Sequence, residues 1–190
     1  MAVLGIAVAA AVLALRAWDA HRGPPLEPWH TYVPADMHAA EIDRSDWTAY
    51  LRREEGVFRA VRRDVVDRID PRTAVPGNRY WADAPIHSGR FAQDFNRSYR
   101  LEPDGPPAGA VLLLHGLTDS PYSLRHIGRR YRDAGFVVVA IRLPAHGTVP
   151  AALTDVEWED WDAATRLAAR EARRRVGADR PLRNAATSAD

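Results

Sequence analysis

Cysteine and lysine are both absent from this chain of 190 residues. Without cysteine, the sequence has no disulfide framework, thiol nucleophile, iron–sulfur cluster or cysteine-based zinc site. Without lysine, it has neither a Schiff-base lysine nor the phosphate-binding lysine of a P-loop. All basic residues are therefore arginine, and the net charge with neutral histidine is only +1. This balance argues against a nucleic-acid partner, because such proteins usually carry a one-sided basic surface.

An apolar run opens the chain. Residues 1–15 carry no charged side chain, and Arg16 and Trp18 follow directly. As a helix, fifteen residues rise about 22 Å, and a snorkelling arginine with an interfacial tryptophan extends this toward the ~30 Å hydrocarbon core. We predict an uncleaved transmembrane anchor over residues 1–18, with membrane lipid as its partner. A cleaved signal peptide and a buried helix are the alternatives. The side of the membrane stays open.

The next part of the chain is rich in proline and glycine. Residues 19–44 are expected to form an extended tether, since their prolines oppose regular helix. A helix is predicted from Ser45, as N-cap, to about Ile69, where Pro71 stops it. The expected division of the chain is an anchor at 1–18, a tether at 19–44, a helical extension with a loop at 45–94, a partial α/β domain at 95–182 and a non-native tail at 183–190.

Two uninterrupted apolar runs lie in the second half of the chain, at residues 110–114 and 136–141. Runs of this kind are typical of strands buried on both faces of a parallel sheet. A short additional strand is expected at 98–101. The segment between the two apolar runs has helical spacing of its apolar residues. The order is therefore strand, loop, helix, strand, which predicts an α/β fold with a parallel sheet and flanking helices.

Local signals mark where the helices of this unit begin and end. Ser120 is expected as N-cap and Pro121 as the first residue of the helix between the strands. Gly135 is expected to end it. A further helix is predicted from Thr154, because Thr154 and Glu157 match a capping box.

The stretches VLLLHGLTDSPYSLR (111–125) and FVVVAIRLPAHG (136–147) resemble the front half of an α/β-hydrolase. The similarity is to the carboxylesterase and monoacylglycerol-lipase-like (serine aminopeptidase-like) branch, which includes membrane-anchored bacterial members, and it covers residues 95–182. It implies a serine hydrolase as the parent enzyme, with a small carboxylic or lipid ester as substrate and with no cofactor or metal.

The resemblance also assigns roles to loop residues. Acyl transfer needs N–H donors for the oxyanion, one of them in the loop after this strand. The resemblance places that donor at the backbone N–H of Leu117, with His115 and Gly116 shaping the turn. His115 is then structural, since the base of the family lies far downstream. His146 and Gly147 are expected to fix the second loop.

The sequence departs from the family pattern at the nucleophile. None of its twelve glycines begins a G-x-S-x-G motif. Ser188 falls near the expected nucleophile position, but Ala186 and Asp190 replace the flanking glycines, and the residues before it look too polar for a central strand. No acid–histidine pair follows. We therefore identify no catalytic residue and expect a truncated, inactive member of the family.

Other functions stay open on the sequence alone. A non-catalytic, membrane-tethered interaction module would keep the tether and helices without needing a nucleophile. A thioesterase shares the same fold. Epoxide hydrolases and haloalkane dehalogenases are disfavoured, because Thr118 stands where they typically have proline. A dinucleotide-binding fold is disfavoured because the loop lacks G-x-G-x-x-G.

Overall fold

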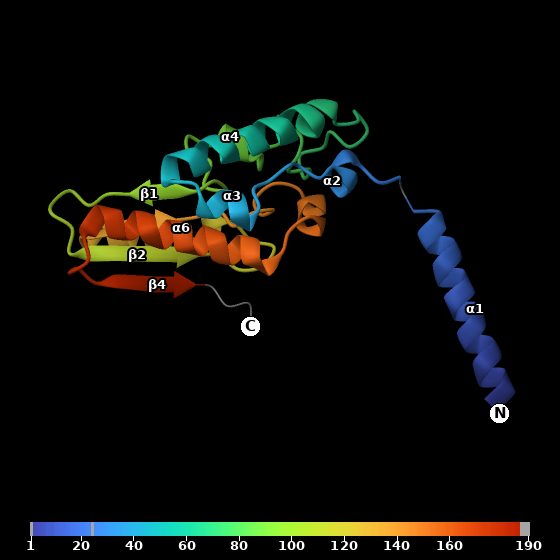
Figure 1. Cartoon of the computed structure of the whole chain (residues 1–190). Helices are drawn as coiled ribbons and strands as arrows, with labels where there is room; N and C mark the ends of the chain where they lie inside the picture. Colours follow the sequence, from blue (N-terminus) through green and yellow to red (C-terminus); the bar gives the residue numbers. More distant parts are fainter. Residues whose placement is uncertain (1, 24, 187–190) are drawn as a thin grey trace.

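The computed structural model describes residues 2–23 and 25–186 (Figure 1). Its centre is a four-stranded sheet in the order β1-β3-β2-β4. The strands are β1 (Tyr99–Leu101), β2 (Gly109–Leu114), β3 (Phe136–Ala140) and β4 (Leu182–Ala186). β2 pairs in parallel with both β3 and β4, whereas β1 is antiparallel to β3. The predicted α/β class, with helices flanking a mainly parallel sheet, is confirmed.

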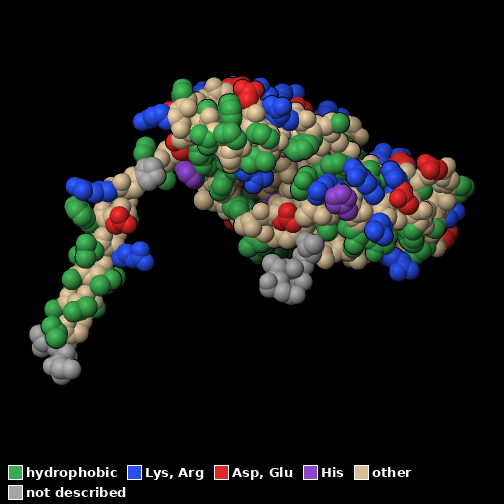
Figure 2. All heavy atoms as spheres, turned by 180° about the vertical axis from the view of Figure 1, so that it is seen from behind, with side chains coloured by type: hydrophobic (Ala, Val, Ile, Leu, Met, Phe, Trp, Pro, Cys, Tyr) green, Lys and Arg blue, Asp and Glu red, His purple; other side chains and the backbone are tan. Residues whose placement is uncertain are grey.

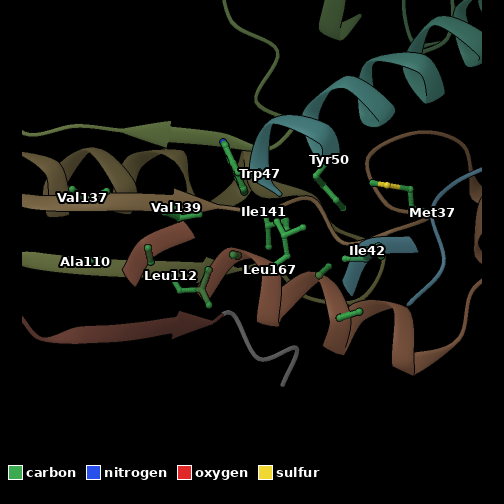
Figure 3. Close-up of a cluster of buried hydrophobic side chains, with 14 of the residues drawn as sticks. Met37, Ile42, Trp47, Tyr50, Ala110, Leu112, Val137, Val139, Ile141 and Leu167 are labelled. Atoms are coloured by element: carbon green, nitrogen blue, oxygen red, sulfur yellow. The ribbon is translucent and has the colours of Figure 1, made fainter. Parts of the chain in front are cut away.

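The two apolar runs form the central strands, as predicted. Alternate side chains of a strand point to opposite faces, so a continuous apolar run feeds two cores. Ala110 and Leu112 of β2 pack on one face with Leu167 of α6 (Trp158–Val176) (Figure 3). Val111 and Leu113 pack on the other face, beside Leu124, which precedes α5 (Arg125–Asp133). The side chains of β2 therefore contribute to one hydrophobic core on each face of the sheet.

Strand β4 lies at the edge of the described sheet, next to β2. The residues before Ser188 are too polar for a central strand, and those from 182 to 186 form this edge strand: Leu182 pairs with Ala110 and the register continues to Ala186 opposite Leu114. Arg183 and Asn184 leave their side chains exposed, so their polarity costs little while their backbone completes the sheet. That residues 183–190 are non-native sequence remains a prediction. Ser188 lies outside the described residues.

The helix predicted from Ser45 begins one residue later. It is α4 (Trp47–Asp64), and its N-cap is Asp46, whose side chain accepts a hydrogen bond from the Ala49 N–H at 2.7 Å. Ser45 instead donates its hydroxyl to the carbonyl of Glu41, in the preceding helix α3 (Ala39–Asp43). A 3₁₀ turn (Val66–Arg68) follows α4 in place of the last predicted helical turn.

The capping box at Thr154 predicted an earlier start for helix α6 than the structure shows. Thr154 closes a 3₁₀ turn (Pro150–Thr154), and its hydroxyl donates to the carbonyl of Ala151. The reciprocal capping pair is Glu157 with Asp160. Asp160 additionally accepts the backbone N–H of Ala39 at 2.7 Å, which ties α6 to α3. This long-range contact favours the later start.

The helix after β2 opens with a 3₁₀ turn (Pro121–Leu124) that continues into α5. Ser120 stands at the cap position, but its hydroxyl donates to Asn96 Oδ1 at 2.8 Å and accepts no capping hydrogen bond from the described helix backbone. Gly135 has φ +87° after α5, which agrees with its predicted place at the helix end.

The N-terminal helix α1 (Ala2–His21) projects from the body of the protein (Figure 1), with hydrophobic side chains along it (Figure 2). Leu4–His21 is long and apolar enough to cross a membrane, and none of it is buried. The predicted tether contains a short helix α2 (Pro28–Thr31) and α3. Met37 and Ile42 are buried in the main core, so this part of the segment packs as part of the domain.

Candidate active-site loops

Two loops meet at the carboxyl edge of the parallel strands. Residues 115–120 follow β2 and residues 141–149 follow β3, and ligands of open α/β sheets bind at this edge. The backbone N–H of Leu143 donates to His115 Nε2 at 3.0 Å. The rings of His115 and His146 lie 5.0 Å apart between their centroids. The structure therefore brings together residues of the two loops that the sequence singled out.

His115 is buried, and both of its ring nitrogens are used. Because Nε2 accepts from Leu143, Nδ1 carries the proton and donates to the carbonyl of Gly116 at 3.0 Å. Burial lowers the pKa of His115 to about 4, so the ring is neutral at physiological pH. A neutral ring with both nitrogens engaged fixes the loop and leaves neither nitrogen available to take a substrate proton.

His146 is also buried and holds its own loop. Its Nδ1 lies 2.9 Å from the carbonyl of Pro144, and the Trp161 indole N–H donates to the same carbonyl at 3.2 Å. Burial lowers the pKa of His146, which favours the neutral ring. Its Nε2 has no hydrogen-bond partner among the residues that the structure describes.

Gly147 is required by the shape of this loop. Its φ is +71°, and a Cβ added there would lie 2.7 Å from the carbonyl oxygen of Asn96. Only glycine combines this backbone conformation with so close an approach. Ala145, two residues earlier, also has a positive φ of 69°. The loop after β3 is thus held in an uncommon conformation beside the segment that contains Asn96.

Leu117 lies at the exposed tip of the loop after β2, with 63% of its surface accessible. Within residues 2–23 and 25–186, no backbone carbonyl accepts a hydrogen bond from its N–H. The N–H of Asp119 instead closes the turn by donating to the carbonyl of Gly116 at 3.2 Å, and the Asp119 carboxylate accepts the N–H of Ser120. Among the described residues, the Leu117 N–H therefore has no backbone partner and can donate to another group.

A cavity of about 390 Å³ opens between the two loops. Residues of both loops line it, together with Arg79, Tyr80 and Asn96 from the segment before β1. It has the size of a small-molecule site, since ligand pockets generally measure about 300–1,000 Å³. No group of three or more metal-binding side chains is found in the described part of the chain.

Sequence reasoning missed a buried arginine that braces this site. Arg142 follows β3 directly and is fully buried. Its guanidinium donates two hydrogen bonds to Asp36, at 2.7 and 2.9 Å, and one to Glu54 at 3.0 Å. Burial acts to raise the pKa of Asp36, but the charge and hydrogen bonds of Arg142 outweigh it and hold that pKa below its ordinary value.

The same cluster fixes the backbone of the loop after β3. Arg142 Nη1 donates to the carbonyl of His146 at 3.1 Å, and Asp36 accepts the N–H of Ala145 at 2.9 Å. The Tyr50 hydroxyl donates to the Arg142 carbonyl at 2.5 Å. The sequence signal for this cluster was an arginine directly after an apolar strand, because an arginine buried there requires an acidic partner. Nothing in the sequence identified Asp36 and Glu54 as those partners.

Comparison with known proteins finds a curated sequence relative and several similar solved structures, one of which is described here. No protein-family model matches the chain. The thermostable monoacylglycerol lipase of Bacillus sp. (strain H-257) is 40% identical over 58 residues, which are 30% of this chain and 23% of the lipase. A chain solved in work on LipS and LipT, two metagenome-derived lipolytic enzymes, is 29% identical with a TM-score of 0.44, covering 50% of this chain and 36% of that one.

The chain thus spans about a quarter of the length of the curated relative that it matches and about a third of the solved one. The sequence match with the lipase supports an α/β-hydrolase relationship.

Proposed function

We propose that residues 95–182, together with the rest of β4 to residue 186, form the N-terminal part of an α/β-hydrolase that cleaves carboxylic or lipid esters. The single observation that carries this is the joining of the two strand-end loops, through Leu143 and His115, beside a cavity of ligand size. The sequence relationship to a monoacylglycerol lipase favours the same chemistry. A thioesterase would use the same loops and differ in its substrate.

In the proposed reaction, a serine attacks the ester carbonyl and the carbonyl oxygen becomes an oxyanion. Donors that are fixed in place before the reaction stabilise this charge most effectively. We assign one donor to the free N–H of Leu117. The neutral His115 ring is hydrogen-bonded through both of its nitrogens and holds the turn that presents the Leu117 N–H. Gly116 shapes the same turn, and His146 and Gly147 hold the loop opposite.

The second donor, the serine, the acid and the base are not identifiable in these residues. No G-x-S-x-G occurs in the 190 residues, and Ser188 lacks both flanking glycines. We therefore propose that this chain, used alone, does not turn over esters. Full-length chain should leave p-nitrophenyl butyrate unhydrolysed above the buffer rate. Turnover that disappears in Ser188→Ala would contradict this part of the proposal.

A graft tests the positive part of the proposal. Residues 109–147 replace the corresponding strand–loop–helix–strand unit of the Bacillus monoacylglycerol lipase, which supplies the remaining machinery. We expect the folded graft to hydrolyse monoacylglycerol. A graft that folds, as shown by cooperative thermal unfolding, but does not hydrolyse the ester would contradict the assignment and favour a non-catalytic tethered module.

We also propose that α1 anchors the protein in a membrane as a single span. Its length, its apolar composition and its complete exposure support this, since an apolar helix of this size is costly to leave in water. Anchoring would place the hydrolase fold close to lipid. A cleaved signal sequence has the same composition, and the two are distinguished by N-terminal sequencing of the mature protein.

A further inference from the structure

A second, smaller cavity of about 110 Å³ lies beside the site cavity. Its apolar walls come from Phe58 and Val61 of α4, Val66 of the following 3₁₀ turn, and Ile86. All four belong to the N-terminal extension, outside the region of the chain that resembles the hydrolase. The extension therefore adds an apolar recess to the candidate site.

The two cavities share one boundary. Arg79, Tyr80, Asn96, Gly147 and Thr148 line both of them. A molecule with its polar end at this boundary would face the loop after β3 and place its apolar end in the recess between α4 and Ile86. The boundary is thus the point where polar recognition and apolar burial meet.

The boundary is positively charged on the side of the smaller cavity. Two neighbouring arginines have acidic partners, Arg62 with Asp67 at 2.9 Å and Arg72 with Asp70 at 2.6 Å. Arg79 has no acidic partner within salt-bridge distance among the residues that the structure describes. None of the described residues that line the smaller cavity is acidic. Asp119 lines the larger cavity, so an anionic group would meet the Arg79 guanidinium without an opposing carboxylate only on the side of the smaller cavity.

Tyr80 adds a neutral donor next to this arginine. Its ring stacks on Trp29, with centroids 5.2 Å apart, which fixes its position. Burial raises the pKa of Tyr80, while the nearby charge of Arg79 acts in the opposite direction. The phenol therefore stays protonated at neutral pH and can donate a hydrogen bond. A guanidinium and a phenol together suit the two oxygens of a carboxylate.

We propose that this boundary binds the carboxylate of a fatty acid, with Arg79 and Tyr80 holding the carboxylate and the Phe58–Ile86 recess holding the chain. The recess has a volume of about 110 Å³, which is small, so we use the short-chain acid hexanoate as the probe.

The site extends the proposed function, since a fatty acid is a product of ester hydrolysis, but it does not depend on it. Binding is measured on a chain that we expect not to hydrolyse esters. A chain that binds the acid while the lipase graft is inactive would keep this site and reject the enzyme assignment. The reverse result would reject this site alone.

The test is calorimetric titration of hexanoate into the full chain in phosphatidylcholine nanodiscs, with empty nanodiscs subtracted. We expect saturable one-to-one binding, weakened about fourfold for each methylene removed toward butyrate. Arg79→Gln should weaken it at least tenfold, and hexan-1-ol should bind correspondingly weakly. The matched control is Arg59→Gln, an exposed arginine of α4 that does not line the cavity, which should bind as the parent does.

A second variant tests whether the alkyl chain of hexanoate lies in the recess. Ile86 is 54% exposed at the recess, so Ile86→Glu adds a negative charge there without opening the core. It should abolish hexanoate binding while the thermal unfolding midpoint stays within a few degrees. Hexanoate binding no greater than in empty nanodiscs, or equal affinity in the parent, Arg79→Gln and Ile86→Glu, would overturn the proposal.

Discussion

The guanidinium of Arg142 and the carboxylate of Asp36 form two hydrogen bonds in the interior, across 106 positions of sequence. The pair joins the segment before α3 to the loop after β3, and Glu54 of α4 completes it. Because Asp36 also accepts the Ala145 N–H, the N-terminal segment is hydrogen-bonded directly to the loop of the candidate site. The N-terminal part of the chain thus supports the site.

Removing one partner of this cluster should destabilise the protein severely. We expect Arg142→Met to cost about 3–5 kcal/mol of unfolding free energy, since it leaves two buried carboxylates without their cation. Urea unfolding followed by tryptophan fluorescence measures this. The control is Arg166→Gln, which breaks an exposed pair with Asp43 and should change the unfolding free energy far less. Equal costs for the two variants would show that the buried cluster contributes no special stability.

The buried His115 should make stability depend on pH. Its folded pKa of about 4 lies below the unfolded value near 6.5, so the unfolded chain binds more protons between these values. Stability is therefore fully present above pH 6.5 and falls as the pH drops toward 4. From the Wyman relation, His115 alone accounts for a loss of about 2 kcal/mol between pH 7.5 and 5.

His115→Gln isolates this contribution, because its amide oxygen can still accept the Leu143 N–H but does not titrate in this range. The difference in unfolding free energy between the parent and His115→Gln should shrink or reverse as the pH falls. His146, whose pKa burial also lowers, and His38, whose pKa its bond to Asp160 raises, remain in both chains and cancel in the difference. A difference that is constant from pH 7.5 to 5 would contradict the neutral, buried state of His115.

Gly147→Ala should destabilise the loop after β3 for two reasons. The positive φ costs about 1–2 kcal/mol for a residue with a Cβ, and the new Cβ would lie 2.7 Å from the Asn96 carbonyl oxygen. Gly135→Ala is the matched control, since Gly135 has φ +87° and only an ordinary 3.7 Å contact at the Cβ position. Thermal unfolding should show Gly147→Ala to be worse by a further 1 kcal/mol or more. Equal effects would mean that the close approach to Asn96 relaxes without cost.

Deleting residues 2–22 should release the protein from membranes. The full chain is expected in the membrane pellet after alkaline carbonate extraction, and the deleted chain in the supernatant. A variant of unchanged length, Val8→Asp with Leu13→Asp, should behave like the deletion, because each aspartate costs about 2.5–3.5 kcal/mol at the centre of a span. Retention of the deleted chain in the pellet would contradict anchoring by α1.

The elements that sequence predicted well are those whose signal is local and redundant. β2 and β3 are uninterrupted apolar runs, which are most stable when they are buried in the interior of the sheet. Gly135 ends its helix because its positive φ suits glycine. The His115 and His146 loops were identified by the resemblance of these segments to the loops of α/β-hydrolases.

The elements that it missed depend on distant contacts. Thr154 has a good local capping signal, but the contact of Asp160 with Ala39 favours a later helix start. β4 is polar, and its backbone hydrogen bonds come from its pairing with β2. No local pattern of residues reveals that pairing. Arg142 lies 106 residues from Asp36 and 88 from Glu54, so only the fold reveals its partners.

The central claim is that the loop after β2 presents the Leu117 N–H to an oxyanion. Monoacylglycerol hydrolysis by the lipase graft measures it directly when Leu117→Pro, which removes that N–H, is compared with Leu117→Ala, which keeps it. With both variants folded, we predict that Leu117→Pro lowers kcat by about 10²–10³ and that Leu117→Ala stays within a few-fold of the graft. Equal activity of the two variants would contradict the assignment.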